Sequence, residues 1–223
     1  MKLNWAERWV VNNPLRVLEQ RLEIRRLKGL KPLPVDAAVL EVGCGRGAGA
    51  ALLLQEFPLA RVYAMDLDVR MVRQAQGYLA SRREERVRLF VGDAFRLPLN
   101  PESLDAVFGF GVLHHVVDWR TALAEIARVL KPGGVYYIEE LYPALYRNFL
   151  TRRLLLHPAE DRFFSHDLRR ALSQADLPLQ SALEVKSLGI LGMAVKGGGT
   201  AGSVPLRRKR QLGAEPADDG NQG

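Results

Sequence analysis

Residues 39–49 join two apolar stretches through a turn that carries almost no side chains. The first stretch, at 39–42, predicts an inner strand of a parallel sheet, and the second, at 50–54, predicts the helix that follows it. Three glycines make up most of the turn: Gly43, Gly45 and Gly47. Glycine admits positive φ and lets the backbone approach a bound molecule, while the N–H groups at a helix start are free to donate. The turn therefore predicts a site for a nucleoside cofactor.

The turn alone leaves the identity of the cofactor open. Gly43, Gly45 and Ala48 also satisfy the G-x-G-x-x-A pattern of dinucleotide-binding proteins. The choice between cofactors depends on residues farther along the chain.

The composition fits one globular domain with appendages. The chain has 223 residues, of which 48% are hydrophobic and 26% charged, enough for one core but not for a second full domain. No apolar run is long enough to cross a membrane, and the first residues are too polar for a secretory signal, so we expect a cytoplasmic protein. The single cysteine, Cys44, excludes an internal disulfide and a thiolate metal cluster, and we predict no metal site. Its favoured role within the glycine turn is packing.

Most of the net charge of +7 belongs to residues 1–34, which hold eight Lys or Arg against three Glu. We predict a helix from about Pro14 to Leu27, and we assign residues 1–34 to a basic helical lid over the cofactor site. Three leucines form one narrow apolar stripe along this helix, with arginines around it: Leu15, Leu18 and Leu22.

Two interpretations of the basic lid remain open. In the first, the helix packs on the domain and its arginines are simply solvated. In the second, the arginines act with Trp5 and Trp9 at an anionic membrane surface, an acidic substrate or RNA, because a purely structural helix has no use for so many uncompensated arginines. Nucleic acid is the weakest of these partners, since no RNA-binding motif accompanies the charge.

Beyond the glycine turn the chain alternates between strands and helices. We predict four further strands, at 60–66, 87–91, 104–109 and 135–140, the last one preceded by a Lys-Pro-Gly-Gly turn at 131–134. Helices are predicted at 69–83, after Asp118, and from about 165 to 175. This order predicts an α/β fold with a doubly wound parallel sheet. Two final strands at 181–187 and 190–196 complete the domain at 35–196, and we expect the polar tail at 197–223 to be disordered.

Two carboxylates end successive predicted strands. Asp66 follows Gly43 at the distance at which a carboxylate can accept hydrogen bonds from both hydroxyls of a ribose. Asp93, together with the backbone N–H of Ala94, can bind the amine and a ring nitrogen of adenine. Either carboxylate alone is ordinary turn chemistry, but their succession indicates an adenosine site.

With these residues in place, the chain resembles the class I S-adenosylmethionine-dependent methyltransferases, in the small-molecule group called methyltransferase type 11. The resemblance covers about residues 36–140 and is specific as a set. It rests on the segments 40–47, 65–68, 92–94, 104–108, 112–116 and 126–134. The fold that it implies is a Rossmann-like, seven-stranded sheet, mostly parallel, with the last strand antiparallel.

The resemblance also implies S-adenosyl-L-methionine as the cofactor and assigns its binding residues. The methionine part would be lined by Glu41, Gly43, Cys44 and Gly45. The ribose and adenine would be held by Asp66 with Leu67, and the adenine by Asp93 with Ala94. The segment from Phe110 and Gly111 to Val112 would lie under the sulfonium. A nicotinamide enzyme needs neither Glu41 nor the Gly-Asp-Ala and Leu-Lys-Pro-Gly-Gly segments, which disfavours a dehydrogenase.

The expected activity is methyl transfer to a small acceptor. Residues 141–156 are rich in leucine and aromatic side chains, so we expect this acceptor to be apolar or aromatic, such as a lipid or quinone precursor. A core-packing helix would show the same pattern. Methyl transfer needs no dedicated catalytic residue unless the acceptor must lose a proton. Candidate bases near the carboxyl edge of the sheet are His114, His115, Glu139, Glu140 and Tyr142. The alternative function is a catalytically silent cofactor-binding domain that serves as a partner or sensor.

Overall fold

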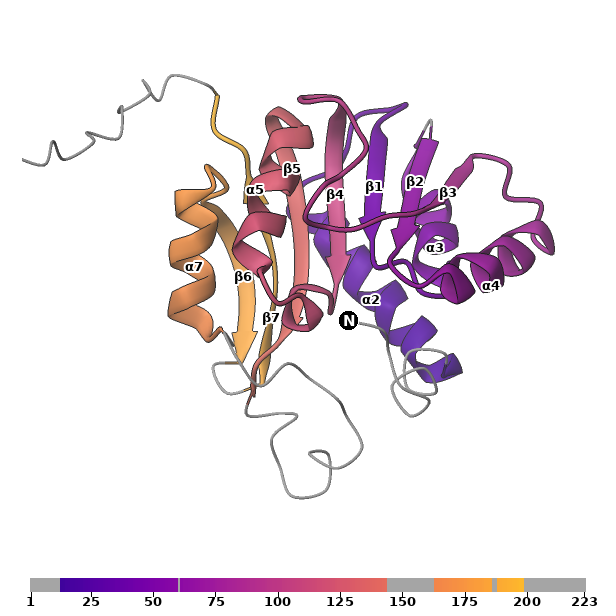
Figure 1. Ribbon diagram of the computed structural model, residues 1–223, viewed down its shortest axis with the longest axis horizontal. Coiled ribbons are helices and arrows are strands. Elements are labelled where there is room, and N and C mark those ends of the chain that lie inside the picture. The colour runs from indigo at the N-terminus through magenta and orange to yellow at the C-terminus, as the bar shows by residue number, and fades with distance from the viewer. Residues whose placement is uncertain (1–12, 60, 144–162, 186–187, 199–223) are drawn as a thin grey trace, which may run out of the picture.

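The computed structural model describes residues 13–59, 61–143, 163–185 and 188–198. Within these ranges the chain forms a seven-stranded sheet with the order β3-β2-β1-β4-β5-β7-β6 (Figure 1). The strands are β1 (Ala38–Val42), β2 (Arg61–Asp66), β3 (Val87–Val91), β4 (Leu104–Phe110), β5 (Leu130–Leu141), β6 (Leu179–Val185) and β7 (Gly189–Val195). Strands β1 to β5 pair in parallel, while β7 runs antiparallel to both β5 and β6. The predicted fold class is confirmed.

Helices cover both faces of the sheet. They are α2 (Pro14–Leu30), α3 (Ala48–Glu56), α4 (Val69–Ala80), the short 3₁₀ helix η1 (Leu113–His115), α5 (Trp119–Val129) and α7 (Ser165–Gln174). Side chains from α2, α3 and α4 share one core with β1 and β2, and those from α5 and α7 share the other with β4 and β5. No helix in the described ranges is long and apolar enough to cross a membrane.

Side chains at the starts of three helices fix where those helices begin. The Asn13 side chain accepts a hydrogen bond from the Leu15 N–H, next to Pro14 at the first helical position. Asp68 caps α4 and Asp118 caps α5 in the same manner. Each cap satisfies an N–H group that has no partner within its helix. The predicted helix starts at Pro14, Val69 and after Asp118 are confirmed.

Strand β5 begins earlier than the sequence predicts. Leu130 already pairs with Leu104, and the next paired position is Val135 with Ala106. Four residues of β5 thus lie opposite one residue of β4, and the ladder is interrupted between the two pairs. Gly133, with φ +75°, provides the left-handed conformation that the interruption requires. The predicted turn at 131–134 is therefore an irregularity within the strand.

Helix α2 packs on the sheet through a face other than the predicted leucine stripe. Ile24 and Leu27 are fully buried, whereas Leu15, Leu18 and Leu22 are 72%, 58% and 59% exposed. The apolar residues of this helix lie on opposite sides, and the pattern alone does not say which side meets the sheet. Trp5 and Trp9, the aromatic segment at 144–162 and the tail from 199 onward lie outside the described residues.

Candidate functional site

A cavity opens at the carboxyl ends of β1, β2 and β4, where parallel sheets of this kind bind ligands. Its volume is about 1050 Å³, including the space at its open mouth. We call it the inner cavity. Its lining residues are Arg16, Gln20, Glu41, Val42, Gly43, Cys44, Gly45, Arg46, Ala48, Gly49, Met65, Asp66, Leu67, Asp68, Met71, Gly92, Ala94, Phe110, Gly111, Val112 and His115.

The glycine turn forms the floor of the inner cavity, and its glycines are needed for two reasons. Gly43 has φ +71°, and a Cβ at this position would lie 2.6 Å from Cγ2 of Val112. Gly49, in the first turn of α3, has ordinary helical backbone, but a Cβ there would collide with Oε1 of Glu41 and lie 2.7 Å from Nε2 of Gln20. The first position needs glycine for its backbone conformation, and the second needs it for space.

Glu41 is a buried carboxylate in the wall of this cavity. Its side chain is 2% exposed, and its Oε2 has no hydrogen-bond partner among the described residues. Burial, together with the nearby Asp66, raises the pKa of Glu41 to about 8. A buried oxygen without a donor is costly, so the cavity is suited to a ligand that brings a donor or a positive charge to Glu41.

Asp66 is held in place by backbone donors on both of its oxygens. Oδ2 accepts from the Gly45 N–H at 3.0 Å, and Oδ1 accepts from the Asp68 N–H at 2.9 Å. Burial raises the pKa of Asp66, while these hydrogen bonds oppose the rise. Asp66 therefore ties the end of β2 to the glycine turn, and its carboxylate faces the inner cavity with a fixed orientation.

Asp93 differs from the other predicted cofactor residues. Its neighbours Gly92 and Ala94 line the inner cavity, but Asp93 itself is exposed and lies outside the set of lining residues. Its Oδ1 accepts from the Phe95 N–H at 3.1 Å, which stabilises the turn after β3. The remaining predicted residues all line the cavity: Glu41, Gly43, Cys44, Gly45, Asp66, Leu67, Ala94, Phe110 and Gly111. Burial raises the pKa of the Cys44 thiol, which suits packing.

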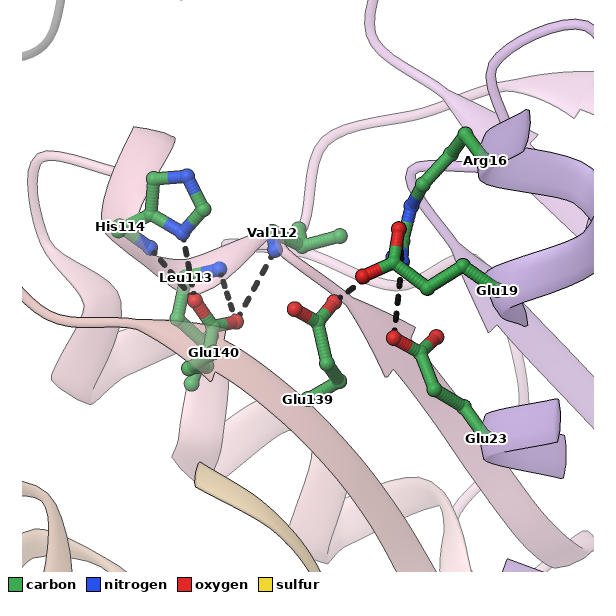
Figure 2. Close-up of polar contacts among 8 residues, drawn as sticks. All are labelled: Arg16, Glu19, Glu23, Val112, Leu113, His114, Glu139 and Glu140. Atoms are coloured by element: carbon green, nitrogen blue, oxygen red, sulfur yellow. Dashed lines mark hydrogen bonds and ion pairs between the residues drawn. The ribbon is translucent and has the colours of Figure 1, made fainter. Parts of the chain in front are cut away.

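Among the candidate bases, Glu140 has a structural role at the start of η1. It is fully buried, and its Oε1 accepts from the N–H groups of Val112 at 3.0 Å and Leu113 at 2.7 Å (Figure 2). Its Oε2 accepts from the His114 N–H at 3.3 Å and lies 2.7 Å from Nδ1 of the same histidine. Glu140 thus holds His114 and the segment that borders the inner cavity.

Two further candidates, His115 and Tyr142, lie in different surroundings. His115 lines the inner cavity. Tyr142 is fully buried and donates its hydroxyl hydrogen bond to Oε1 of Glu184 at 2.6 Å. Burial, followed by this contact with Glu184, raises the pKa of Tyr142. Of the five candidate bases, all in the described part of the chain, His115 is the one that lines the inner cavity.

A second, more open cavity of about 530 Å³ lies on the other side of the end of β5. We call it the outer groove. Its lining residues are Glu23, Glu139, Glu140, Leu141, Leu183, Val185, Leu188, Gly189, Ile190 and Leu191. Apart from three glutamates its walls are apolar. The sequence did not predict this groove, because it forms where α2, β5 and the β6–β7 hairpin meet.

Glu139 lies between the two cavities. It lines the outer groove, while its Oε2 lies 3.5 Å from the position that a Cβ of Gly111 would take, at the border of the inner cavity. The same oxygen accepts from Nη2 of Arg16 at 3.0 Å (Figure 2). Burial raises the pKa of Glu139 to about 8, although Arg16 opposes this rise.

Arg16 joins three carboxylates near this point. Besides Glu139 it contacts Glu23 at 2.8 Å and Glu19 at 3.0 Å (Figure 2). Burial lowers the pKa of Arg16, but Glu139 and Glu23 raise it more, so the guanidinium stays charged. Arg16 and Gln20, which the sequence did not single out, line the inner cavity. Their spacing of four places them on one face of α2.

Other basic residues of α2 also have partners. Arg25 pairs with Glu56 at 2.9 Å, and Arg21 donates to the side chain of Gln55 at 2.8 Å. Lys28 donates to the backbone oxygen of Glu56. The expectation of uncompensated arginines is therefore wrong for Arg16 and Arg25, which pair with carboxylates, whereas the partner of Arg21 is neutral.

The fold and the inner cavity define an α/β protein that binds a nucleoside cofactor at the carboxyl edge of a Rossmann-like sheet. Residues 40–138 match the model of a methyltransferase domain family. This match agrees with the sequence motifs, which resemble the class I S-adenosylmethionine-dependent methyltransferases of the type 11 group. S-adenosylmethionine is the cofactor of this family.

Two curated relatives match about half of this chain. Phthiotriol/phenolphthiotriol dimycocerosates methyltransferase of Mycobacterium tuberculosis is 39% identical over 107 residues, which cover 47% of this chain and 38% of that protein. Malonyl-acyl-carrier protein O-methyltransferase of Methylococcus capsulatus is 37% identical over 111 residues, which cover 48% of this chain and 39% of that protein. The chain thus spans about two fifths of the length of these relatives.

The solved structures support the fold over a longer stretch. A S-adenosylmethionine-dependent methyltransferase from Aquifex aeolicus superimposes with a TM-score of 0.71 at 22% identity, over 87% of this chain and 99% of that one. The likeness extends beyond the matched domain model, and at this identity it concerns the fold.

Proposed function

We propose that the protein transfers a methyl group from S-adenosylmethionine, bound in the inner cavity, to a small apolar acceptor bound in the outer groove. The observation that carries the proposal is the position of Glu139, which lines the groove and lies against Gly111 of the inner cavity. An acceptor in the groove therefore has a short path to the border of the inner cavity.

The residues of the inner cavity fit this cofactor. S-adenosylmethionine carries two positive groups, a sulfonium and an ammonium. Glu41 offers a buried carboxylate oxygen that has no donor among the described residues and can therefore accept such a group. We assign the methionine part to Glu41, Gly43, Cys44 and Gly45. Asp66 and Leu67 bind the ribose, Ala94 with Gly92 borders the adenine, and Phe110 with Gly111 lies beneath the sulfonium. We place Asp93 at the rim of the adenine site, where its carboxylate also accepts the hydrogen bond that stabilises the turn after β3.

The chemistry requires alignment more than acid–base help. When bound, the sulfonium supplies a methyl group that is already activated for in-line displacement. The acceptor would displace the sulfur from this methyl carbon, and the sulfur would keep the electron pair of the broken bond. The protein holds the acceptor in line and excludes water. If the acceptor is a hydroxyl, its proton passes to the Glu139 carboxylate, because burial raises the pKa of Glu139 and so makes it a stronger base than an exposed carboxylate.

The acceptor class follows from the walls of the outer groove. Leu141, Leu183, Val185 and Ile190 offer an apolar surface, and Glu139 is placed at the inner end. The two curated relatives are named for dimycocerosates and for an acyl-carrier protein. Both names refer to acyl compounds, which supports an apolar, lipid-like acceptor for this protein.

Two measurements test the proposal. Calorimetry should show binding of S-adenosylmethionine and of its demethylated product, and no binding of NAD. Incubation with methyl-labelled cofactor and a pooled lipid extract should then transfer label to a lipid fraction, and Glu139→Gln should reduce that transfer while leaving cofactor binding intact. Cofactor binding without transfer to any extract would favour the catalytically silent alternative. Binding of NAD instead would overturn both.

A further inference from the structure

Helix α2 has a second apolar face that the fold does not use. Leu15, Leu18 and Leu22 are 72%, 58% and 59% exposed. Their spacing places them in one row, about 10 Å long, along the outside of the helix. Ile24 and Leu27 make the contacts to the sheet side. Exposed leucines in a continuous row are a binding surface more often than isolated ones are.

Basic side chains flank this row. By helical geometry Arg26 follows Leu22 by four residues on one side, and Arg25 and Arg21 lie along the other. Arg26 is exposed and has no hydrogen-bond or ion-pair partner among the described residues. Glu19, the acid closest to the row, is paired with Arg16 at 3.0 Å. Arg25 is compensated by Glu56, but Arg26 on one side and Arg21, whose partner Gln55 is neutral, leave positive charge on both edges of the apolar row.

We propose that this leucine row docks on an anionic lipid surface, with α2 lying in the plane of the headgroups. Leucine side chains on a surface helix bury themselves at the boundary of headgroups and acyl chains, and flanking arginines meet lipid phosphates. The sequence suggested an anionic surface from the charge of the segment together with Trp5 and Trp9. The structure adds that Arg21 and Arg25 bind residues of α3, whereas the three leucines face outward.

The chemistry favours lipid over a second copy of the chain. Three leucines bury far less than the about 1,200 Å² that a stable interface needs. A symmetric contact through this row would also bring the arginines of two copies together, which costs free energy. An anionic lipid surface instead offers negative charge at the edges and apolar depth at the centre.

Docking in this orientation would also bring the lipid surface close to the two cavities, because α2 contributes to the lining of both. The inner face of the same helix supplies Arg16 and Gln20 to the inner cavity and Glu23 to the outer groove. A lipid-embedded acceptor would reach the groove over a short distance. This link rests on the proposed function, whereas the docking itself does not.

The test is sedimentation of the full-length protein with phosphatidylcholine vesicles that contain or lack phosphatidylglycerol. The parent should bind the anionic vesicles, and Leu15→Ser/Leu18→Ser/Leu22→Ser should bind them about tenfold more weakly or worse. Val35→Ser/Val117→Ser, at residues 74% and 59% exposed elsewhere, is the matched control and should bind like the parent. Arg26→Gln should weaken binding at low salt, and the difference should vanish at high salt.

Thermal melting and cofactor calorimetry establish that each variant is folded, and Leu15→Ser alone repeats the test with the mildest change. The proposal is overturned if the parent does not bind anionic vesicles, or if the folded leucine variants bind as well as the parent. It is also overturned if light scattering shows a dimeric parent and a monomeric triple variant, since the row would then bind a second copy. None of these outcomes depends on methyl transfer.

Discussion

Nη2 of Arg16 in α2 lies 3.0 Å from Oε2 of Glu139 in β5, two residues that are 123 positions apart in the chain. Arg16 lines the inner cavity and Glu139 lines the outer groove, so this ion pair sits where the two meet. It also fixes α2 against the end of the central strand. A helix that the sequence presents as a basic appendage is thereby part of the site.

Breaking this ion pair should destabilise the protein. Arg16→Met leaves Glu139 and Glu23 close together without their shared cation, so we expect the free energy of unfolding to fall by about 1–3 kcal/mol. Urea unfolding at neutral pH measures this loss. Arg26→Met, on the same helix but exposed and unpaired among the described residues, is the control and should change stability by less than about 0.5 kcal/mol. Equal effects of the two changes would show that the pair contributes nothing.

Asp66 and Asp93 should contribute very differently to cofactor affinity. Asp66→Asn removes the charged acceptor from a residue that lines the inner cavity, so S-adenosylmethionine should bind roughly tenfold to a hundredfold more weakly. Asp93→Asn changes an exposed side chain, so the loss should be less than about threefold. Isothermal calorimetry of both variants checks this order. A larger loss from Asp93→Asn would mean that its side chain turns into the cavity when the cofactor binds.

Gly49→Ala should damage the site through a steric conflict. The added methyl group would collide with Oε1 of Glu41 and press on Gln20, so we expect a loss of about 1–3 kcal/mol in stability together with weaker cofactor binding. Gly77→Ala is the matched control, because a Cβ at that exposed position in α4 meets nothing within 4 Å. It should stabilise the protein by up to about 1 kcal/mol. Thermal melting should show a lower melting temperature for Gly49→Ala and an unchanged or higher one for Gly77→Ala.

The pKa of Glu41 predicts how stability depends on pH. Its value of about 8 in the folded protein lies above the ordinary value of 4.5. Between these values the folded state binds more protons than the unfolded state, so the stability that protonated Glu41 contributes is lost as pH rises towards 8. Glu41→Gln removes this contribution. Its free energy of unfolding should therefore fall less steeply between pH 5 and 8 than that of the parent, by on the order of 1 kcal/mol or more in total.

Glu139 keeps its own pH dependence in both proteins, since its pKa is also raised to about 8, so the comparison isolates Glu41. Denaturant unfolding at a series of pH values provides the measurement. Parallel curves for parent and variant would contradict a raised pKa for Glu41. Cofactor binding should also weaken in Glu41→Gln, because the variant cannot place a negative charge beside the ligand.

The inner cavity could be predicted largely from the sequence, because its parts depend on local structure. The turn at 43–47 needs glycine for its backbone angles, and Asp66 occupies the end of a strand that the alternation of apolar residues already defines. The caps at Asn13, Asp68 and Asp118 act within four residues. Asp93 shows where prediction from local sequence stops. An aspartate that stabilises a turn looks the same in the sequence whether or not its side chain faces a ligand.

The sequence by itself determined the order of strands and helices, the cofactor motif and the carboxyl edge where it lies, because periodicity, glycine conformations and helix caps act between near neighbours. Only the tertiary structure decided which face of α2 is buried, that Glu140 holds the η1 backbone, and that Arg16 reaches Glu139. These contacts join residues far apart in the chain, and each depends on the shape and charge that the neighbouring elements present after they have packed together.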